Sequence, residues 1–186
     1  MDFWTTWKWN SLVAETRMDD IFIALGSNLG DRRGQMIEAL KALQHDGVVH
    51  RVSPLYQTGA YGMIDQPDFY NAVVRFSSPL APLPLLRQLK QIEQALGRQQ
   101  RIRWGPREID LDIIFYGTQQ LKMPELIIPH PDFRNRRFVL QPLNDIAPEF
   151  IDPQSGQTVR ELLKTCSDNT HVILIAEDWY LDELEI

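Results

Sequence analysis

Short apolar runs alternate along this chain with segments in which apolar residues recur every three or four positions. The runs are typical of buried strands, and they cover residues 21–25, 48–56, 69–76, 109–115 and 171–176. The helical spacing predicts one helix capped by Asp31 and further helices over residues 82–96, 134–143 and 159–164. Strands and helices interleave without internal repeats, so we predict an α/β sandwich in which one sheet is covered by helices.

A proline, a long loop and the last apolar run refine this pattern. Pro54 falls inside the second predicted strand, where it cannot donate a ladder hydrogen bond, so we expect an edge or a bend there. The loop over residues 58–67 is long enough to have a function of its own. A return strand is expected to run through Leu121, and the terminal run over residues 171–175 is interpreted as core.

Two carboxylates interrupt the apolar strand over residues 109–115. Successive side chains of a strand point to opposite faces, so Asp110 and Asp112 share one face while Ile109, Leu111 and Ile113 share the other. Two neighbouring buried anions repel each other and need cations. Mg²⁺ is the first candidate, because it prefers oxygen ligands and commonly combines one or two carboxylates with substrate phosphates. The alternative is a strand end at which solvent or a neighbouring arginine satisfies the pair.

An arginine-rich loop leads directly into this acidic strand. Arg98, Arg101, Arg103 and Arg107 surround a Gly-Pro turn, and guanidinium groups match phosphate oxygens in a bidentate manner. A solvated surface loop is the ordinary interpretation of such a segment. The combination of the loop with the acidic strand is more specific than either part, and it indicates nucleotide-dependent phosphoryl chemistry.

Other candidates are ambiguous when taken singly. Phe69 and Asn71 share a strand face and could stack on and hydrogen-bond a flat heterocycle, or serve as a core residue and a turn residue. His130 lies in a Pro-His-Pro-Asp loop and could face phosphate, although a loop histidine without a role is the simpler interpretation. The glycine-rich segment 26–31 is interpreted as a structural turn rather than an anion site, and Glu93 as a solvated helix residue.

Composition narrows the classes of function. The chain has 186 residues, 44% of them hydrophobic, and a net charge of −6, which argues against a general nucleic-acid binder. A single cysteine, Cys166, excludes an intrachain disulfide and fits a reducing cytoplasm. No apolar run approaches the roughly 20 residues of a membrane span. We interpret residues 1–17, which hold three of the five tryptophans, as an N-terminal extension and residues 18–186 as a single domain.

Four segments occur together in the order and spacing of one enzyme family. They are Leu-Gly-Ser-Asn-Leu-Gly (25–30), Asp-Gln-Pro-Asp-Phe-Tyr-Asn (65–71), Arg-Trp-Gly-Pro-Arg-Glu-Ile-Asp-Leu-Asp (103–112) and Ile-Pro-His-Pro-Asp (128–132). In these segments the chain closely resembles the 6-hydroxymethyl-7,8-dihydropterin pyrophosphokinases of the folate pathway. The likeness covers roughly residues 20–163. It implies a ferredoxin-like α/β (α+β) sandwich with one mostly antiparallel sheet, and transfer of the β,γ-diphosphate of ATP to the pterin hydroxymethyl group with release of AMP.

The resemblance also implies roles for individual residues, position by position. Asp110 and Asp112 match the aspartates that hold two Mg²⁺ ions in the family. The pterin site would comprise Thr58, Asn71, Trp104 and the two rings of Phe69 and Phe138, with phenylalanine at 69 where the family often has tyrosine. The triphosphate would be held by Arg98, Arg101, Arg107, His130 and Arg136. Adenine would lie among Leu86, Ile113 and Leu126, with Glu93 nearby.

Two further classes of function were weighed. A non-catalytic pterin- or nucleotide-binding module would be expected to have lost the aspartate pair or His130, and both are present. An RNA-binding ferredoxin-like domain conflicts with the net charge and with the acidic strand face. The partners expected are therefore ATP and a reduced pterin, without nucleic acid or membrane. We also expect the protein to be a monomer in the cytoplasm.

Overall fold

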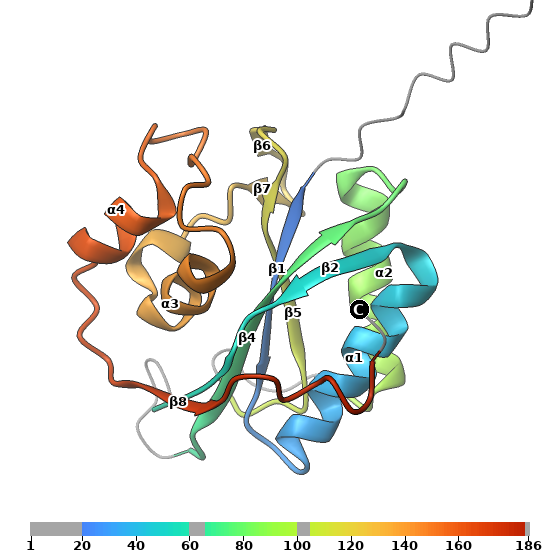
Figure 1. The fold of residues 1–186 in the computed structure, drawn as a ribbon. Helices are drawn as coiled ribbons and strands as arrows, with labels where there is room; N and C mark the ends of the chain where they lie inside the picture. Colours follow the sequence, from blue (N-terminus) through green and yellow to red (C-terminus); the bar gives the residue numbers. More distant parts are fainter. Residues whose placement is uncertain (1–19, 60–65, 100–104, 185–186) are drawn as a thin grey trace, which may run out of the picture.

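An antiparallel sheet forms the centre of the protein (Figure 1). The structure is a computed structural model, and it describes residues 20–59, 66–99 and 105–184. Six strands form the sheet, in the order β5-β1-β4-β3-β8 with β2 also paired to β4, and each pairing is antiparallel. Their bounds are Ile21–Ser27 (β1), Val48–Val52 (β2), Leu55–Thr58 (β3), Phe69–Ser77 (β4), Asp110–Tyr116 (β5) and Val172–Ala176 (β8).

Helices cover both faces of this sheet. The pair α1 (Arg32–Asp46) and α2 (Pro82–Ala95) lies on one face, and the pair α3 (Arg137–Ile146) and α4 (Val159–Thr165) lies on the other (Figure 1). The element order β1-α1-β2/β3-β4-α2-β5 and the strand order confirm the expected ferredoxin-like α+β sandwich. Three smaller elements complete the described part: β6 (Leu121–Lys122), β7 (Ile127–Ile128) and a 3₁₀ turn, η1 (Phe133–Asn135).

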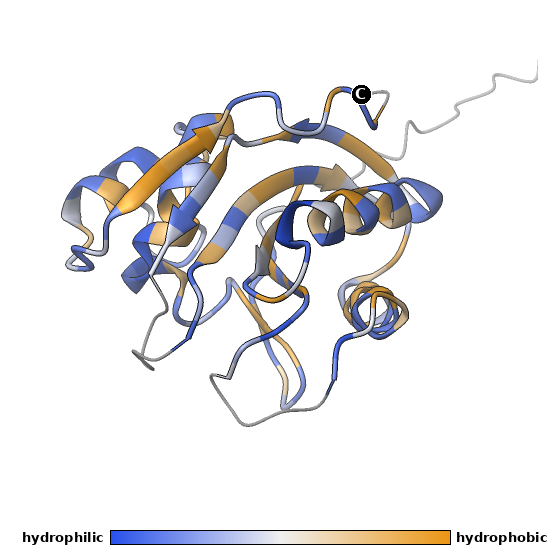
Figure 2. Cartoon of the chain, turned by 90° about the horizontal axis from the view of Figure 1, so that it is seen from below, coloured by the Kyte–Doolittle hydropathy of each residue, from blue (hydrophilic) through white to orange (hydrophobic). Residues whose placement is uncertain are grey.

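Strand alternation divides the core into two apolar clusters. On β1, Ile21, Ile23 and Leu25 face α1 and α2, whereas Phe22 packs on the other side against α3 and α4. The second cluster is aromatic at its centre, because Phe115 stacks edge-on against Phe22 and Phe133. Figure 2 shows apolar residues along the strands and on parts of the helices, with hydrophilic residues on many of the loops. The central strands are therefore buried on both faces, except where the α3 side opens into a pocket.

Two irregularities of the sheet were partly foreseen. Ser53 and Pro54 break one predicted strand into β2 and β3, and both pieces pair with β4, which confirms the expected bend. A bulge in β5 places Phe22 opposite Phe115 but Ile23 opposite Ile113, so that Ile114 is an extra residue. The alternation N-terminal to this bulge is intact, so the two aspartates share one face as predicted, and that face is on the α3 side.

The C-terminal segment corrects one prediction. The run 171–175 was interpreted as core, but β8 lies at the outer edge of the sheet and Ile173, Leu174 and Ile175 are 55%, 48% and 43% exposed. The burial in this region comes instead from Trp179 and Tyr180, which pack against the α1/α2 cluster. The apolar pattern was enough to predict the strand. Its burial depends on whether helices cover the sheet edge, and the local sequence does not contain that information.

No helix in the described part of the chain combines the length and apolar composition that a membrane span requires.

Candidate active site

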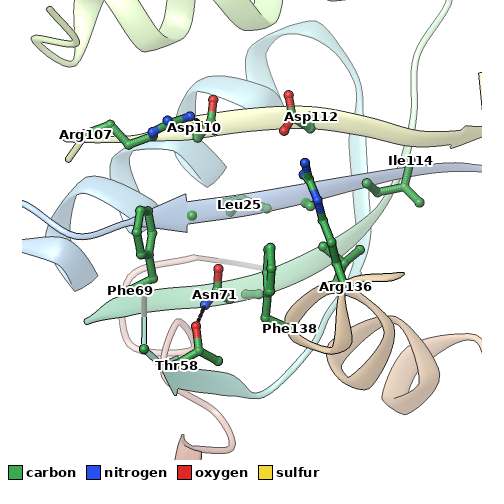
Figure 3. A pocket seen from close by; sticks show the side chains of 15 residues that line it. Leu25, Thr58, Phe69, Asn71, Arg107, Asp110, Asp112, Ile114, Arg136 and Phe138 are labelled. Carbon is green, nitrogen blue, oxygen red and sulfur yellow. Dashed lines mark hydrogen bonds and ion pairs between the residues drawn. The ribbon is translucent and has the colours of Figure 1, made fainter. Parts of the chain in front are cut away.

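One pocket opens on the α3 side of the sheet, at the ends of β1, β3, β4 and β5 (Figure 3). Most of the residues singled out on these strands meet here. The predicted residues that line it are Thr58, Phe69, Asn71, Arg107, Asp110, Asp112, Arg136 and Phe138. Segments that are far apart in the sequence thus supply an amide, two aromatic rings, two carboxylates and two arginines to a single cavity.

The half of the pocket nearest β3 and β4 is lined by two aromatic rings and an amide. Thr58 and Asn71 are buried at its base, and the Asn71 amide donates to the Thr58 hydroxyl at 2.8 Å. Phe69 and Phe138 project into the cavity on either side of Asn71 (Figure 3). Aromatic rings with an amide between them can stack on a heterocycle while its polar edge is hydrogen-bonded.

The other half of the pocket is acidic, and arginines neutralise its first carboxylate. Arg98 and Arg107 donate to the two carboxylate oxygens of Asp110 at 2.6 and 2.5 Å. Burial acts to raise the pKa of Asp110, but the two guanidinium groups outweigh it and hold the pKa below its ordinary value. Asp110 is therefore an ionised group whose charge is already balanced within the protein.

The second carboxylate is less well compensated. Asp112 lies 3.9 Å from the ammonium of Lys90, and its side chain is 36% exposed. Burial within the site and the charge of Asp110 raise the pKa of Asp112, while Lys90, His130 and Arg136 oppose that shift. In Figure 3 both aspartates extend from β5 to the same side, and the guanidinium of Arg136 points towards Asp112. An additional cation at this point would relieve a repulsion that the protein leaves in place.

Among the described residues, no group of three or more His, Cys, Asp or Glu side chains gathers as a ready metal cage. The donor set that Asp110 and Asp112 offer is two carboxylates on one strand face. That set fits Mg²⁺, which usually takes one or two carboxylates and completes its shell with water and substrate phosphates.

Glu93 corrects a second prediction. It was interpreted as a solvated helix residue, but it is 2% exposed. Its Oε1 accepts from Lys90 Nζ and from the backbone N–H of Leu111, both at 2.7 Å, and its Oε2 pairs with Arg98 at 2.5 Å. Burial raises the pKa of Glu93 and Lys90 opposes the shift. The residue ties α2 to β5 and to Arg98, which a helical pattern alone does not reveal.

Two basic residues after β7, His130 and Arg136, lie near the aspartates in different surroundings. Arg136 lines the pocket, pairs with Asp132 at 3.2 Å, and lies 5.9 Å from the centre of the Phe138 ring. His130 is held near Asp112 by its backbone N–H, which donates to the carbonyl of Ile114 at 3.0 Å. Burial lowers the pKa of His130, so the ring is biased towards its neutral form.

The residues expected near adenine lie together, but not in this pocket. Ile113 and Leu126 are buried in the α1/α2 cluster, and Leu86 packs against the same cluster. Leu86 also lines a separate hollow with Lys90 and Glu125. The group therefore lies across the edge strand β5 from the two aspartates.

Two predicted site residues, Arg101 and Trp104, lie outside the described residues, as do the central parts of both glycine- and proline-rich loops.

Sequence reasoning missed two residues around the site. Asn28 was assigned to a structural turn but is buried and bonded to both neighbouring loops. Lys90 reaches the carbonyl of Leu111 as well as Glu93 and Asp112. Its position three residues before Glu93 on one helix was a signal that could have been used.

A ferredoxin-like α/β domain with an acidic, arginine-lined pocket is thus the class that fold and site define, and comparison with known proteins specifies it. Residues 22–148 match the family described as 7,8-dihydro-6-hydroxymethylpterin-pyrophosphokinase (HPPK). The chain belongs to this family, whose members are pyrophosphokinase enzymes.

Relatives of known name support the same assignment. The chain is 44% identical over 148 residues to the 2-amino-4-hydroxy-6-hydroxymethyldihydropteridine pyrophosphokinase of Pseudomonas aeruginosa, covering 78% of this chain and 91% of that one. It is 42% identical to the enzyme of the same name from Haemophilus influenzae, covering 82% and 96% of the two chains.

Solved structures agree in fold. The HPPK-DHPS of Plasmodium falciparum, crystallised with pteroate, superposes with a TM-score of 0.64 at 19% identity over 80% of this chain. The present chain spans less than half of that longer protein, 42% of its length.

Proposed function

We propose that this protein transfers the β,γ-diphosphate of ATP to the hydroxymethyl group of 6-hydroxymethyl-7,8-dihydropterin and releases AMP, as a step of folate biosynthesis. The observation that carries the proposal is the composition of one pocket. An aromatic and amide slot for a flat ring adjoins two carboxylates and two arginines suited to a metal-bound polyphosphate.

The pterin is proposed to occupy the slot between Phe69 and Phe138. Its polar edge would be hydrogen-bonded by Asn71 and Thr58, which already orient each other at 2.8 Å. Trp104 is proposed to complete this subsite, on the strength of the family resemblance. Stacking at position 69 needs only a ring, so phenylalanine can serve there without a hydroxyl.

The triphosphate is proposed to lie along the acidic side of the pocket, held by Arg98, Arg101, Arg107, Arg136 and His130. Two Mg²⁺ ions held by Asp110 and Asp112 would supply charge neutralisation at the attacking and leaving oxygens. In the structure Arg98 and Arg107 pair with Asp110. Substrate binding would exchange these partners, so that each arginine gains phosphate oxygens as the carboxylate gains a cation.

The chemical step follows from this arrangement as an in-line displacement. A bond forms between the hydroxymethyl oxygen and the β-phosphorus, and the bond from the β-phosphorus to the oxygen bridging it to the α-phosphorus breaks. AMP leaves with that bridging oxygen, and the hydroxyl proton passes to solvent or to a phosphate oxygen. The arginines stabilise charge that develops in the transition state, so little covalent chemistry is required of the protein.

The adenine is proposed to lie beside Leu86, Ile113 and Leu126, beyond the edge of β5 and near Glu93. The nucleotide would then pass from this apolar group to the aspartates on the other side of the strand.

A single chain supplies all of these groups, which is consistent with a monomer, and the lone cysteine is consistent with a reducing cytoplasm.

The test is pterin-dependent formation of AMP. Protein, ATP, Mg²⁺ and the reduced hydroxymethylpterin are incubated, and AMP is separated from ADP by chromatography. We expect AMP only when the pterin is present, and none from Asp112→Ala. Asp182→Asn, at an exposed carboxylate outside the pocket, is the matched control and should behave as the wild type. Pterin-independent ADP would refute the proposal.

A further inference from the structure

Asn28 makes contacts with both loops that flank the pocket. It follows the last residue of β1 and is 1% exposed. Its backbone N–H donates to the carbonyl of Arg107 at 3.1 Å, and its side-chain oxygen accepts from the backbone N–H of Arg107 at 2.8 Å. The two residues thus bond reciprocally and extend the contact between β1 and β5 beyond the strands themselves.

The other end of the same amide holds the second loop. Asn28 Nδ2 donates to the carbonyl of Pro67 at 3.0 Å and to the side-chain oxygen of Gln66 at 3.2 Å. Pro67 stands two residues before Phe69, and Arg107 stands three residues before Asp110. One planar side chain therefore connects the segment that leads to the aromatic slot with the segment that leads to the acidic strand.

An amide suits this connection better than other side chains of its size. It offers an acceptor on one side for the Arg107 N–H and a donor on the other for the Pro67 carbonyl. A carboxylate retains the acceptor but places a second oxygen against a carbonyl, and an alanine removes both contacts. Buried backbone groups that lose such partners cost free energy until the chain moves to satisfy them.

We propose that Asn28 is a positioning residue that holds the pterin-side and phosphate-side loops in a fixed relation, so that the acceptor hydroxyl and the β-phosphorus meet in line. The inference rests on the proposed function and adds to it a residue that contacts neither reacting group. A displacement of about 1 Å between reacting partners can cost on the order of 100-fold in rate, which sets the scale of the expected effect.

The two halves of the contact predict different kinetic defects. Asn28→Asp should lose the hydrogen bond to the Pro67 carbonyl and keep the one from the Arg107 N–H. We therefore expect it to raise the KM for the pterin about tenfold or more. Asn28→Ala should also lower kcat by about tenfold or more, because Arg107 is released as well. Asn169→Asp and Asn169→Ala are the matched controls, since they change an exposed asparagine outside the pocket in the same two ways.

A measurement without substrate separates this inference from the proposed function. Amide hydrogen exchange of Arg107 should be slow in the wild type and in Asn28→Asp, and fast in Asn28→Ala, whether or not the protein makes AMP.

If the wild type makes no AMP but exchange follows this pattern, the proposed function fails and the contact stands. If the wild type makes AMP and both variants keep kcat and KM within twofold, the positioning role is refuted. Should Asn28→Ala not fold, Asn28→Asp decides alone, and an unchanged pterin KM overturns the proposal.

Discussion

At the scale of the residue, the two aspartates of β5 differ although they share one strand face. Asp110 binds two guanidinium groups at 2.5–2.6 Å, whereas Asp112 has a lysine at 3.9 Å and remains partly exposed. The charge of Asp112 is therefore the one that the proposed Mg²⁺ would balance. Removing it should therefore affect catalysis more than stability.

We predict that Asp112→Ala abolishes turnover and changes the free energy of unfolding by less than about 1 kcal/mol, a shift in Tm below about 4 °C. The reason is that Asp112 makes no short ion pair within the described residues. Steady-state AMP formation and thermal unfolding check the two parts. Activity close to that of the wild type would contradict the metal assignment.

Arg107 should act on the rate rather than on pterin affinity. Arg107→Ala removes a charge beside Asp110 but leaves the backbone contacts with Asn28, so we expect kcat to fall by about 100-fold or more and the pterin Kd to remain nearly unchanged. Arg160→Ala, at an exposed arginine that pairs with an exposed glutamate, is the control. A defect confined to pterin binding would remove the charge-stabilising role.

The residues of the site were predictable to the extent that they depend on strand alternation. The shared faces of Asp110 and Asp112, and of Phe69 and Asn71, follow from a period of two residues. The burial of Glu93 and the contacts of Asn28 do not, because their partners other than Lys90 are 5 to 79 positions away and are set by tertiary packing.

At the scale of the element, a buried carboxylate fixes the connection between α3 and α4. Asp152 is fully buried and accepts from Arg134 Nε at 2.7 Å, from Ser155 Oγ at 2.5 Å and from the backbone N–H of Gln154 at 3.1 Å. Arg134, one of the arginines after His130, therefore holds the loop beyond α3 and does not line the pocket.

This contact gives a pH-dependent stability. Burial raises the pKa of Asp152, but hydrogen bonds from Ser155, Gln154 and Arg134 outweigh it and lower the pKa below its ordinary value. Because the folded-state pKa is depressed, the stabilisation is present above the unfolded pKa of about 3.9 and is lost as the pH falls through the folded value.

We therefore expect Asp152→Asn to lose about 1–3 kcal/mol at pH 7 and the deficit to shrink below pH ~4. Urea unfolding at pH 7 and pH 3 measures both. A deficit that is the same at the two pH values would contradict the ionic origin of the effect.

The C-terminal segment is a structural part of the domain although the family match ends at residue 148. Trp179 is 2% exposed, and its indole N–H donates to the carbonyl of Ser53 at 2.9 Å. Arg33 on α1 donates to the carbonyl of Trp179 at 2.6 Å. These contacts fasten the segment beyond β8 to the bend between β2 and β3.

We predict that Trp179→Ala destabilises the protein by about 3–5 kcal/mol, as expected for a large buried side chain. Leu181→Ala, two residues away and 51% exposed, should cost less than about 0.5 kcal/mol. Chemical unfolding compares the two variants. Equal stabilities would show that the segment beyond β8 contributes little to the fold.

Elements were predictable where local chemistry decides them. Pro54 marked a true bend, and the apolar stripe of residues 82–96 became α2. The helix predicted over residues 134–143 instead begins at Arg137, after the turn η1. The exposure of β8 depends on its place at the sheet edge, so a local apolar pattern could not distinguish it from a core strand.

At the scale of the whole molecule, the alternation of strands and helices was enough to predict a helix-covered sheet. The strand order was not contained in that pattern, because it rests on long-range pairings such as Ile21 with Phe76 and with Tyr116. The family resemblance supplied this information. The same topology carries β1, β4 and β5 side by side, which brings three of the four separated sequence motifs to one pocket.

In the proposed reaction a diphosphate moves intact from ATP to the pterin. Phosphorus NMR of a reaction run to completion tests it most directly, because it distinguishes an ester diphosphate from a monophosphate and AMP from ADP in one sample. We predict AMP and a pterin diphosphate in equal amounts, with no inorganic phosphate. ADP accompanied by a pterin monophosphate, or by free phosphate, would contradict the account.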